Sequence, residues 1–200
     1  MIGIEDRDGV LVLTLRRPEK ANSLTKAMLE DLDAAFAATK ASAVILTGEG
    51  KVFSAGADLD EARAGLATDP VWDRLSNRIA ALPCLTIAAL NGTLAGGAMG
   101  MVLACDLRLA VPTAKFFYPV MKLGFLPQPS DPARLVALVG PARAKMILMG
   151  GAKIEAEEAL AWGLIDRIVA PEALLESANA LATDALAAKA GHAAAIKAMI

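Results

Sequence analysis

The feature that most constrains this chain is a strand–turn–helix unit in its middle, TIAALNGTLAGGAMGMVLACDL (Thr86–Leu107). The apolar run Leu85–Leu90 leads into Asn91-Gly92, and Gly96-Gly97-Ala98 then opens an apolar helix that we predict to end near Ala104. A strand without polar alternation is buried on both faces, which is typical of a parallel sheet covered by helices. Glycines at the start of a helix also let a ligand approach backbone N–H groups that have no partner within the helix. The unit therefore predicts an α/β fold and a possible site for an anion or oxyanion.

Two better-known glycine motifs do not fit this unit. A dinucleotide-binding loop needs G-x-G-x-x-G directly after the strand and an acidic residue about 20 positions further on. Here the pattern is N-G-x-x-x-G-G-x-x-G, and no acidic residue follows in the right context. No G-K-[ST] phosphate-binding loop occurs either. The glycines alone could also serve only close packing of helix against strand, so both interpretations stay open at this point.

The rest of the chain alternates short apolar runs with helical patterns and has no internal repeat. We predict further strands over Ile2–Glu5, Val10–Leu15, Ala43–Leu46, Asp106–Ala110 and Leu164–Val169. We predict further helices over Thr25–Lys40, Pro70–Leu82, Pro132–Val139, Pro141–Met149, Ala156–Trp162 and Pro171 to about Ala188, the first capped by Ser23 or Thr25. No linker divides the chain. We expect a single domain over residues 1–200, with an α/β core to about residue 170 and a helical C-terminal region over about 171–200.

Composition limits the partners and the location. Hydrophobic residues make up 56% of the chain, which predicts that some apolar surface is buried between subunits. A net charge of −2 without a basic run predicts no nucleic-acid partner and no anionic membrane surface. The apolar runs fall short of the roughly 20 residues needed to span a bilayer. The acidic start MIGIEDRDG lacks the layout of a signal peptide, so we expect a cytoplasmic protein.

The cysteines and the single histidine argue against several kinds of catalytic centre. Cys84 and Cys105 are too far apart for a CxxC redox or zinc site, and we expect both to be buried as small apolar side chains. His192 is the only histidine and lies in an alanine-rich tail. A Ser-His-Asp triad or a histidine metal site would need this residue, so we expect neither. We predict no metal and no separate cofactor.

A second segment, KVFSAGADL (Lys51–Leu59), has a short β run, then small residues, then an acid that can cap the following turn. Together with the central glycine unit, its part FSAGADL resembles the crotonase (enoyl-CoA hydratase/isomerase) superfamily. Further matches are RRPEKANSL (Arg16–Leu24), PVMKLGFLP (Pro119–Pro127) and AWGLIDRIV (Ala161–Val169), so the resemblance covers nearly the whole chain. It implies a crotonase-type spiral of βαβ units with C-terminal helices, assembled as a homotrimer or hexamer. Members usually continue for several tens of residues beyond the point matching Ile200. Either this sequence is incomplete there, or the protein is a short variant, for which we expect a more open acyl pocket or one closed by another element.

The resemblance also implies the ligand and its site. The ligand is an acyl-CoA thioester, with coenzyme A as part of the substrate. The backbone N–H groups of Ala57 and Gly97 would hold the thioester carbonyl and stabilise an enolate, at roughly 2.7–4 kcal/mol per donor. Lys20 or Arg16 could pair with a CoA phosphate, or either could be an ordinary solvated charge. The expected substrate-binding residues are Lys20, Ala21, Ala55, Ala57, Asp58, Leu59, Gly96, Gly97, Val120 and Leu123, with Asp58 more a turn cap than a proton carrier.

The sequence departs from the family at the acids. Hydratases resembling this chain use two glutamates, and the matching positions hold Gly100 and Val120, neither of which can move a proton. Family isomerases often keep the second acid, which is missing too, and a dehalogenase would need a histidine near the first loop. Asp131 is the candidate acid or base, although Ser130-Asp131-Pro132 also suits a helix N-cap. The other candidate acids are Tyr118, Asp60 and Glu61. For Tyr118 we expect core packing instead, and for Asp60 and Glu61 a solvated helix face.

We therefore expect an acyl-CoA enzyme of the enoyl-CoA hydratase/isomerase type whose exact reaction the residues do not fix. One alternative is a non-catalytic acyl-CoA-binding protein that kept the oxyanion hole and lost its acids. The other is an acyl-CoA hydrolase or C–C lyase that uses Asp131 or another relocated acid.

Overall fold

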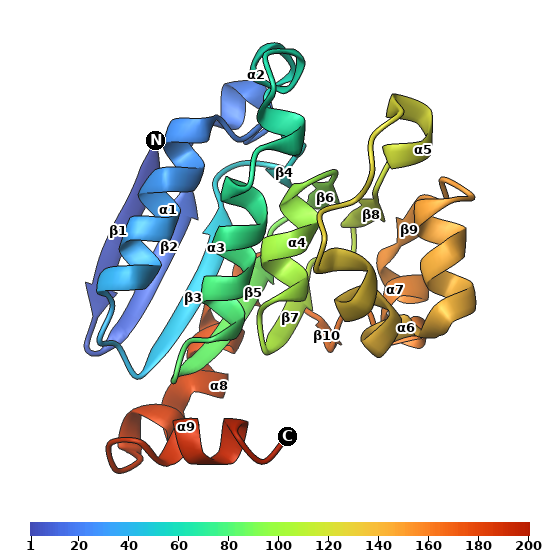
Figure 1. The fold of residues 1–200 in the computed structure, drawn as a ribbon. Helices are drawn as coiled ribbons and strands as arrows, with labels where there is room; N and C mark the ends of the chain where they lie inside the picture. The colour runs from blue at the N-terminus through green and yellow to red at the C-terminus, as the bar shows by residue number, and fades with distance from the viewer.

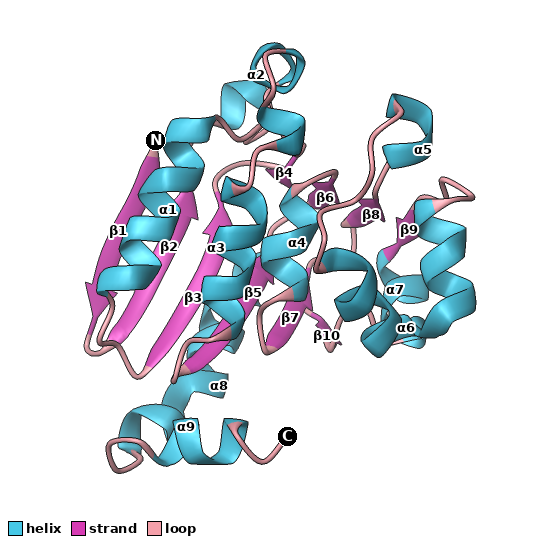
Figure 2. Ribbon diagram, in the orientation of Figure 1, coloured by secondary structure: helices cyan, strands magenta, loops and turns pink.

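The computed structural model describes residues 1–200 and contains two β-sheets with helices packed around them (Figures 1 and 2). The larger sheet has six strands in the order β1-β2-β3-β5-β7-β10. These strands are β1 (Ile2–Arg7), β2 (Val10–Leu15), β3 (Ala43–Gly48), β5 (Leu85–Leu90), β7 (Leu107–Ala110) and β10 (Arg167–Ile168). The β1–β2 hairpin is antiparallel and all other neighbours in this sheet pair in parallel. The predicted α/β class with a largely parallel sheet is confirmed.

The smaller sheet has four short strands in the order β4-β6-β8-β9. They are β4 (Val52–Ser54), β6 (Thr93–Ala95), β8 (Lys115–Phe117) and β9 (Ile154–Glu155). The sequence indicated only the first of these, because two or three residues are too few to show a strand pattern. The chain passes from β3 into β4 and from β5 into β6, so the carboxyl ends of two central strands lead into this second sheet.

Helices cover both faces of the larger sheet. On one face lie α1 (Lys26–Ala38), α3 (Val71–Ala80) and α4 (Ala98–Leu103), in front of the strands in Figure 1. On the other face α8 (Leu174–Ala187) packs against the central strands. The longest helix, α6 (Asp131–Leu148), packs beside α4, and α7 (Ala156–Trp162) follows it. Thr25 caps α1 by accepting a hydrogen bond from the Met28 N–H at 3.2 Å.

Six short elements complete the fold: the helices α2 (Leu59–Arg63), α5 (Val120–Leu123) and α9 (His192–Lys197), and the 3-10 turns η1 (Pro18–Lys20), η2 (Leu66–Thr68) and η3 (Pro171–Ala173). Of the three α-helices, only α5 was not anticipated, because four residues cannot show a helical period. A helix face was expected for Asp60 and Glu61, which lie on α2, and α9 lies in the predicted helical C-terminal region. His192 is exposed at the start of α9, and Figure 1 shows α9 at the opposite end of the molecule from β4 and α5. No helix is long and apolar enough to cross a membrane.

The two helices predicted over Pro132–Val139 and Pro141–Met149 are confirmed: they adjoin within α6 on either side of Gly140, whose φ of +79° and ψ of 164° are not helical. One sequence prediction differs from the structure. The strand predicted over Leu164–Val169 shortens to β10, because Leu164 and Ile165 are buried in a turn whose N–H groups bond back to α7. Cys84 and Cys105 are free and buried, as predicted.

Candidate functional site

Two loops at the carboxyl ends of β4 and β6 meet at two glycines. Gly56 and Gly96 both have positive φ angles, +91° and +58°, which side-chain-bearing residues rarely adopt. A Cβ atom on Gly56 would lie 2.9 Å from the Ala95 carbonyl oxygen and 3.3 Å from the Gly96 Cα. The absence of side chains lets the two backbones touch, so the residues that follow, Ala57 and Gly97, reach one cavity from two separate loops.

The backbone N–H of Ala57 has no acceptor in the protein. Its two neighbours bond to the same residue: the Leu24 N–H donates to the Gly56 carbonyl at 2.7 Å, and the Asp58 N–H donates to the Leu24 carbonyl at 2.9 Å. Successive N–H groups of an extended segment point in opposite directions. The Ala57 N–H therefore points away from Leu24, on the side of the segment that is free of hydrogen bonds.

The backbone N–H of Gly97 is likewise without an acceptor. Gly97 stands at the N-cap position of α4, where the first N–H groups have no partner inside the helix. The N–H of Gly96, one residue earlier, is already engaged, because it donates to the Phe117 carbonyl at 3.1 Å. A side chain on Gly97 would meet Trp72, whose ring atoms lie 3.3–3.4 Å from the Cβ position. Two free donors thus line one cavity, an arrangement that can hold an oxygen on which negative charge develops.

The cavity itself is mostly apolar and has a volume of about 240 Å³. Seven of the ten predicted substrate-binding residues line it: Ala55, Ala57, Leu59, Gly96, Gly97, Val120 and Leu123. Of the other lining residues, the sequence indicated only Tyr118, as a candidate acid or base. It did not indicate Ala62, Arg63, Ala67, Trp72, Pro119, Phe125, Leu126 and Gln128. Most of these lie on short helices or loops, where no periodic pattern marks the inward face. An exposed apolar rim is formed by Leu59, Leu123, Phe125 and Leu126.

Lys20, Ala21 and Asp58 do not line the cavity. Lys20 is exposed and forms no ion pair, whereas Arg16 pairs with Glu5 at 2.7 Å. The Ala21 carbonyl accepts from the Ala55 N–H at 2.9 Å and so supports the cavity wall from behind. Of the two candidate cations, only Lys20 has no ion-pair partner in the protein.

Asp58 has a structural role, as predicted. Its carboxylate caps α2 by accepting from the Asp60 N–H at 3.1 Å and the Glu61 N–H at 3.4 Å. It also forms an ion pair with Arg17 at 2.8 Å, and the hydrogen bond from this guanidinium lowers the pKa of Asp58. The pair joins the RRPEKANSL segment to the FSAGADL segment.

The Asn22 side chain joins the RRPEKANSL segment to the residues just before FSAGADL. Asn22 is fully buried with a φ of +50°. Its Nδ2 donates to the carbonyls of Glu49 at 2.9 Å and Val52 at 2.8 Å, while its Oδ1 accepts from the Arg17 N–H at 2.8 Å. The RRPEKANSL match therefore reflects a brace beneath the loop that carries Ala57.

Asp131 lies directly against α4 at Gly100, a position that has no side chain. A Cβ atom on Gly100 would be 2.6 Å from Asp131 Oδ1 and 3.1 Å from Oδ2. Oδ2 accepts a hydrogen bond from the Tyr118 hydroxyl at 2.9 Å, whereas Oδ1 is buried without a partner. The N-cap interpretation of Asp131 is wrong. Ser130 holds the N-cap position of α6 without a side-chain cap bond, and Asp131 is turned inward because Gly100 leaves room for its carboxylate.

The surroundings make Asp131 a group that can both take and give a proton. It is 1% exposed. Burial raises the pKa of Asp131 to about 6, although the Tyr118 hydrogen bond and the charge of Arg134 both act to lower it. Burial and the neighbouring carboxylate together raise the pKa of Tyr118. A carboxyl group whose pKa lies near the working pH is suited to acid–base catalysis.

Tyr118 packs in the core, as expected, with 4% of its surface exposed, and it also lines the cavity. Its hydroxyl donates to Asp131 and accepts from the Gln128 N–H at 3.3 Å. Asp60 and Glu61 do not line the cavity. Asp60 is exposed and pairs with Arg63 at 3.2 Å, and Glu61 accepts from the Lys26 N–H at 2.6 Å, which confirms their place on a surface helix.

Comparison with known proteins agrees with this architecture. The sequence model of the family described as enoyl-CoA hydratase/isomerase matches residues 5–200, so the chain belongs to this family, within the crotonase superfamily. It is 36% identical over 186 residues to a probable enoyl-CoA hydratase of Rhizobium meliloti, covering 88% of this chain and 71% of that protein. It is 34% identical over 180 residues to 4-chlorobenzoyl coenzyme A dehalogenase-1 of Arthrobacter, covering 84% and 65%. The crystal structure of a putative enoyl-CoA hydratase from Streptomyces coelicolor superposes with a TM-score of 0.91 at 31% identity, covering 98% of this chain and 77% of that one.

Proposed function

We propose that this protein is an acyl-CoA enzyme that stabilises a thioester enolate, with the carbonyl oxygen held by the N–H groups of Ala57 and Gly97. The observation that carries the proposal is that both N–H groups lack an acceptor and that both residues line one apolar cavity. When the α-proton of a thioester leaves, negative charge gathers on the carbonyl oxygen. Preorganised donors in such a cavity stabilise that charge, by roughly 2.7–4 kcal/mol for each donor.

The acid–base group in this proposal is the pair Tyr118–Asp131. Its support is spatial: the Asp131 carboxylate fills the place of the side chain missing at Gly100, where related hydratases have a glutamate. At the second glutamate position, Val120 supplies no acid. One acid–base pair suits reactions that remove and return a proton at carbon, such as exchange or double-bond migration. Addition of water by the two-carboxylate route of hydratases is expected to be very weak.

Two alternatives use the same cavity. A non-catalytic acyl-CoA-binding role is favoured by the absence of both glutamates and by the burial of Asp131. Thioester hydrolysis or C–C cleavage would use Asp131 as a relocated acid. In all three cases the ligand is an acyl-CoA, and the exposed Lys20 is the proposed contact for a CoA phosphate.

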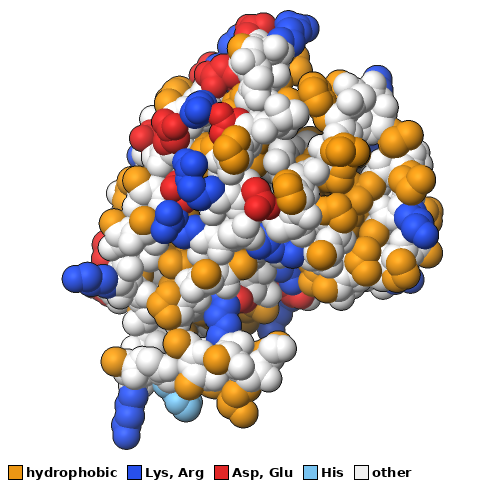
Figure 3. Space-filling view, in the orientation of Figure 1, with side chains coloured by type: hydrophobic (Ala, Val, Ile, Leu, Met, Phe, Trp, Pro, Cys, Tyr) orange, Lys and Arg blue, Asp and Glu red, His pale blue; other side chains and the backbone are white.

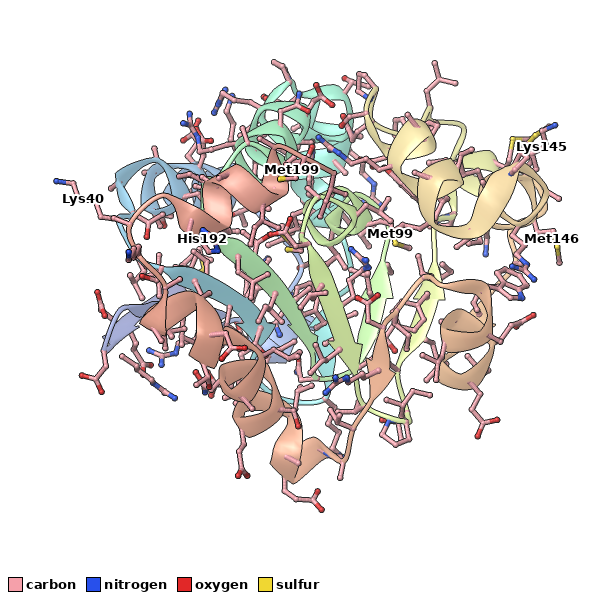
Figure 4. All side chains as sticks on the ribbon, turned by 90° about the horizontal axis from the view of Figure 1, so that it is seen from below. Lys40, Met99, Lys145, Met146, His192 and Met199 are labelled. Carbon is pink, nitrogen blue, oxygen red and sulfur yellow. The ribbon has the colours of Figure 1, made fainter.

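We also propose that the protein assembles as a homotrimer or hexamer. Exposed apolar side chains on α6 and α7 support this, because such groups favour burial against another subunit. They are Val136 and Met146 on α6, Met149 directly after α6, and Leu160 on α7. Figure 3 shows hydrophobic atoms gathering on the side of the molecule where α6 and α7 lie. Figure 4 shows Met146 and Lys145 at the outer surface, in contrast to Met99 in the interior. Light scattering on the purified protein measures the mass of the assembly.

The test of the function is exchange of solvent deuterium into the α-carbon of 3-enoyl-CoAs, whose α C–H bond can break to give an enolate, followed by mass. Crotonyl-CoA and longer 2-enoyl-CoAs, whose α C–H is vinylic, test hydration. Gly97→Pro removes the N–H, and the φ of Gly97, −59°, already suits a proline ring. We expect this change to slow exchange by about 100-fold or more. The matched control is Gly97→Ala, which keeps the N–H while adding a Cβ atom beside Trp72 and should retain exchange.

The outcomes separate the candidates. Exchange that is unaffected by Gly97→Pro would refute the assigned oxyanion hole. Tight binding of acyl-CoA without exchange or product would identify the non-catalytic alternative, and release of free CoA would identify hydrolysis. Hydration at the rate of ordinary hydratases would contradict the interpretation of Gly100 and Val120.

A further inference from the structure

Tyr118 and Asp131 stand in different relations to the cavity. Tyr118 lines it together with Gly97 and Val120, whereas Asp131 does not. The Asp131 Oδ1 atom faces the backbone of α4 at Gly100, and Oδ2 is reached only by the Tyr118 hydroxyl among the side chains of the protein. The tyrosine is thus the member of the pair that an acyl group in the cavity would touch.

We propose that Tyr118 is the catalytic residue that exchanges a proton with the bound acyl-CoA, and that Asp131 acts through it as the proton store. This inference rests on the proposed function. The hydroxyl has the bonding capacity for the role. It donates its hydrogen to Asp131 and accepts from the Gln128 N–H, and one lone pair remains for a group in the cavity.

The relay conserves atoms and charge. When the α C–H bond breaks, its electron pair enters the enolate and its proton joins the Tyr118 oxygen. In the same step the original hydroxyl proton moves to Asp131 Oδ2, so the tyrosine ends neutral and the carboxyl group ends protonated. The reverse sequence delivers a proton to the α-carbon or, in an extended enolate, to the γ-carbon. No oxidant or reductant takes part.

The charges around Asp131 fit a store that fills and empties near neutral pH. Arg134 on α6 favours the ionised form, Asp73 on α3 opposes it, and Tyr118 donates to it. From the side of α4 no ionisable group faces it, since that helix reads Ala-Met-Gly-Met-Val-Leu. Because the pKa of the Tyr118 hydroxyl is raised, a tyrosinate would be unfavourable in this site. The Asp131 carboxylate, which accepts from the hydroxyl at 2.9 Å, can take the proton so that the tyrosine stays neutral.

The test compares Tyr118→Phe and Asp131→Asn in the deuterium-exchange assay. Each should slow exchange by about 100-fold or more, and the double variant should be no slower than either single one, because both residues serve one relay. Thr47→Val is the matched control. It deletes another buried hydroxyl that donates to a backbone carbonyl, at 2.8 Å, and it should leave exchange unchanged. Affinity for acyl-CoA, measured by calorimetry, should stay near that of the unaltered protein in both relay variants.

The results distinguish the relay from the proposed function. Exchange absent in the unaltered protein defeats the proposed function itself. Exchange that stays within about threefold in Tyr118→Phe, but is lost in Asp131→Asn, overturns the relay alone and makes Asp131 the direct base. Exchange lost only in Tyr118→Phe overturns the storage role of Asp131.

A spectroscopic readout tests the pair without activity. Tyr118 is the only tyrosine in the chain, so growth on 3-fluorotyrosine places one fluorine label at this position. We expect a single ¹⁹F resonance that shifts with pH around a midpoint of about 6, as Asp131 titrates, and that loses this titration in Asp131→Asn. A resonance that is indifferent to pH between about 4.5 and about 7.5 would overturn the coupling on which the relay depends.

Discussion

The carboxylate of Asp131, at the first residue of α6, occupies the space in which a side chain at Gly100 on α4 would begin. A position of α4 that has no side chain is thereby filled by an acid from another helix. The relationship leads to a test of packing that is independent of any reaction.

Gly100→Ala should lower the free energy of unfolding by about 1–3 kcal/mol, since the new Cβ atom would lie 2.6 Å from Asp131 Oδ1 in a buried site. In the Asp131→Ala background the same change should instead be stabilising by roughly 0.5–1 kcal/mol, because alanine is favoured over glycine inside a helix. Urea unfolding of the four proteins measures both effects. Equal effects of Gly100→Ala in the two backgrounds would show that the two residues do not meet.

The raised pKa of Asp131 predicts a particular dependence of stability on pH. Folding raises this pKa from 3.8 to about 6, so in that interval the folded protein holds a proton that the unfolded chain has lost. The resulting stabilisation is fully present below pH 3.8 and is lost as pH rises through about 6. The difference in unfolding free energy between the unaltered protein and Asp131→Asn should therefore fall by about 3 kcal/mol from acid to neutral pH. A difference that is constant with pH would place Asp131 in a solvated environment.

Lys20 and Arg16 form a matched pair for testing CoA binding. Lys20→Ala should weaken acyl-CoA binding about two- to fivefold at low salt, the range for one exposed charge pair, and less at high salt. Arg16→Ala should leave affinity unchanged, because Glu5 already engages its guanidinium at 2.7 Å. Titration calorimetry at two ionic strengths measures both. A larger loss of affinity in Arg16→Ala than in Lys20→Ala would show that Arg16, and not Lys20, contacts the CoA phosphate.

Replacing Asn22 should damage the fold more than its small size suggests. Asn22→Ala leaves three backbone groups, at Arg17, Glu49 and Val52, without the hydrogen bonds that this side chain gives them. We expect a loss of about 3–5 kcal/mol of stability. Asn179→Ala, which removes one bond to the Leu175 carbonyl within α8, is the control and should cost about 1 kcal/mol or less. Similar losses in the two variants would mean that Asn22 is not a brace.

The sequence revealed the elements long enough to show a period and the motifs that tie it to a family. The β1–β2 hairpin, β3, β5, α1 and α4 were predicted from apolar spacing, and Thr25 was one of two expected caps. Three strands of the second sheet, β6, β8 and β9, were missed, because segments of two or three residues carry no pattern.

The site was only partly predictable for a different reason. Ala57 and Gly97 were predicted from the family resemblance alone, because neither has a polar side chain that would indicate a role in binding or catalysis. Asp131 was recognised as a candidate, yet its inward position depends on how α6 packs on Gly100, 31 positions earlier in the chain. Local spacing near Ser130 instead suggested a helix cap. The orientation of Tyr118 toward the cavity follows from the same long-range packing and from its bond to Asp131.

The contact between Gly56 and Gly96 means that the part of the cavity at Ala57 and Gly97, the proposed site of the thioester carbonyl, is formed by main-chain atoms. Substitutions of side chains elsewhere around the cavity leave this part intact. A change of side chain at Tyr118, Val120 or Leu123 can therefore alter the chemistry of the cavity without moving the backbone N–H groups of Ala57 and Gly97.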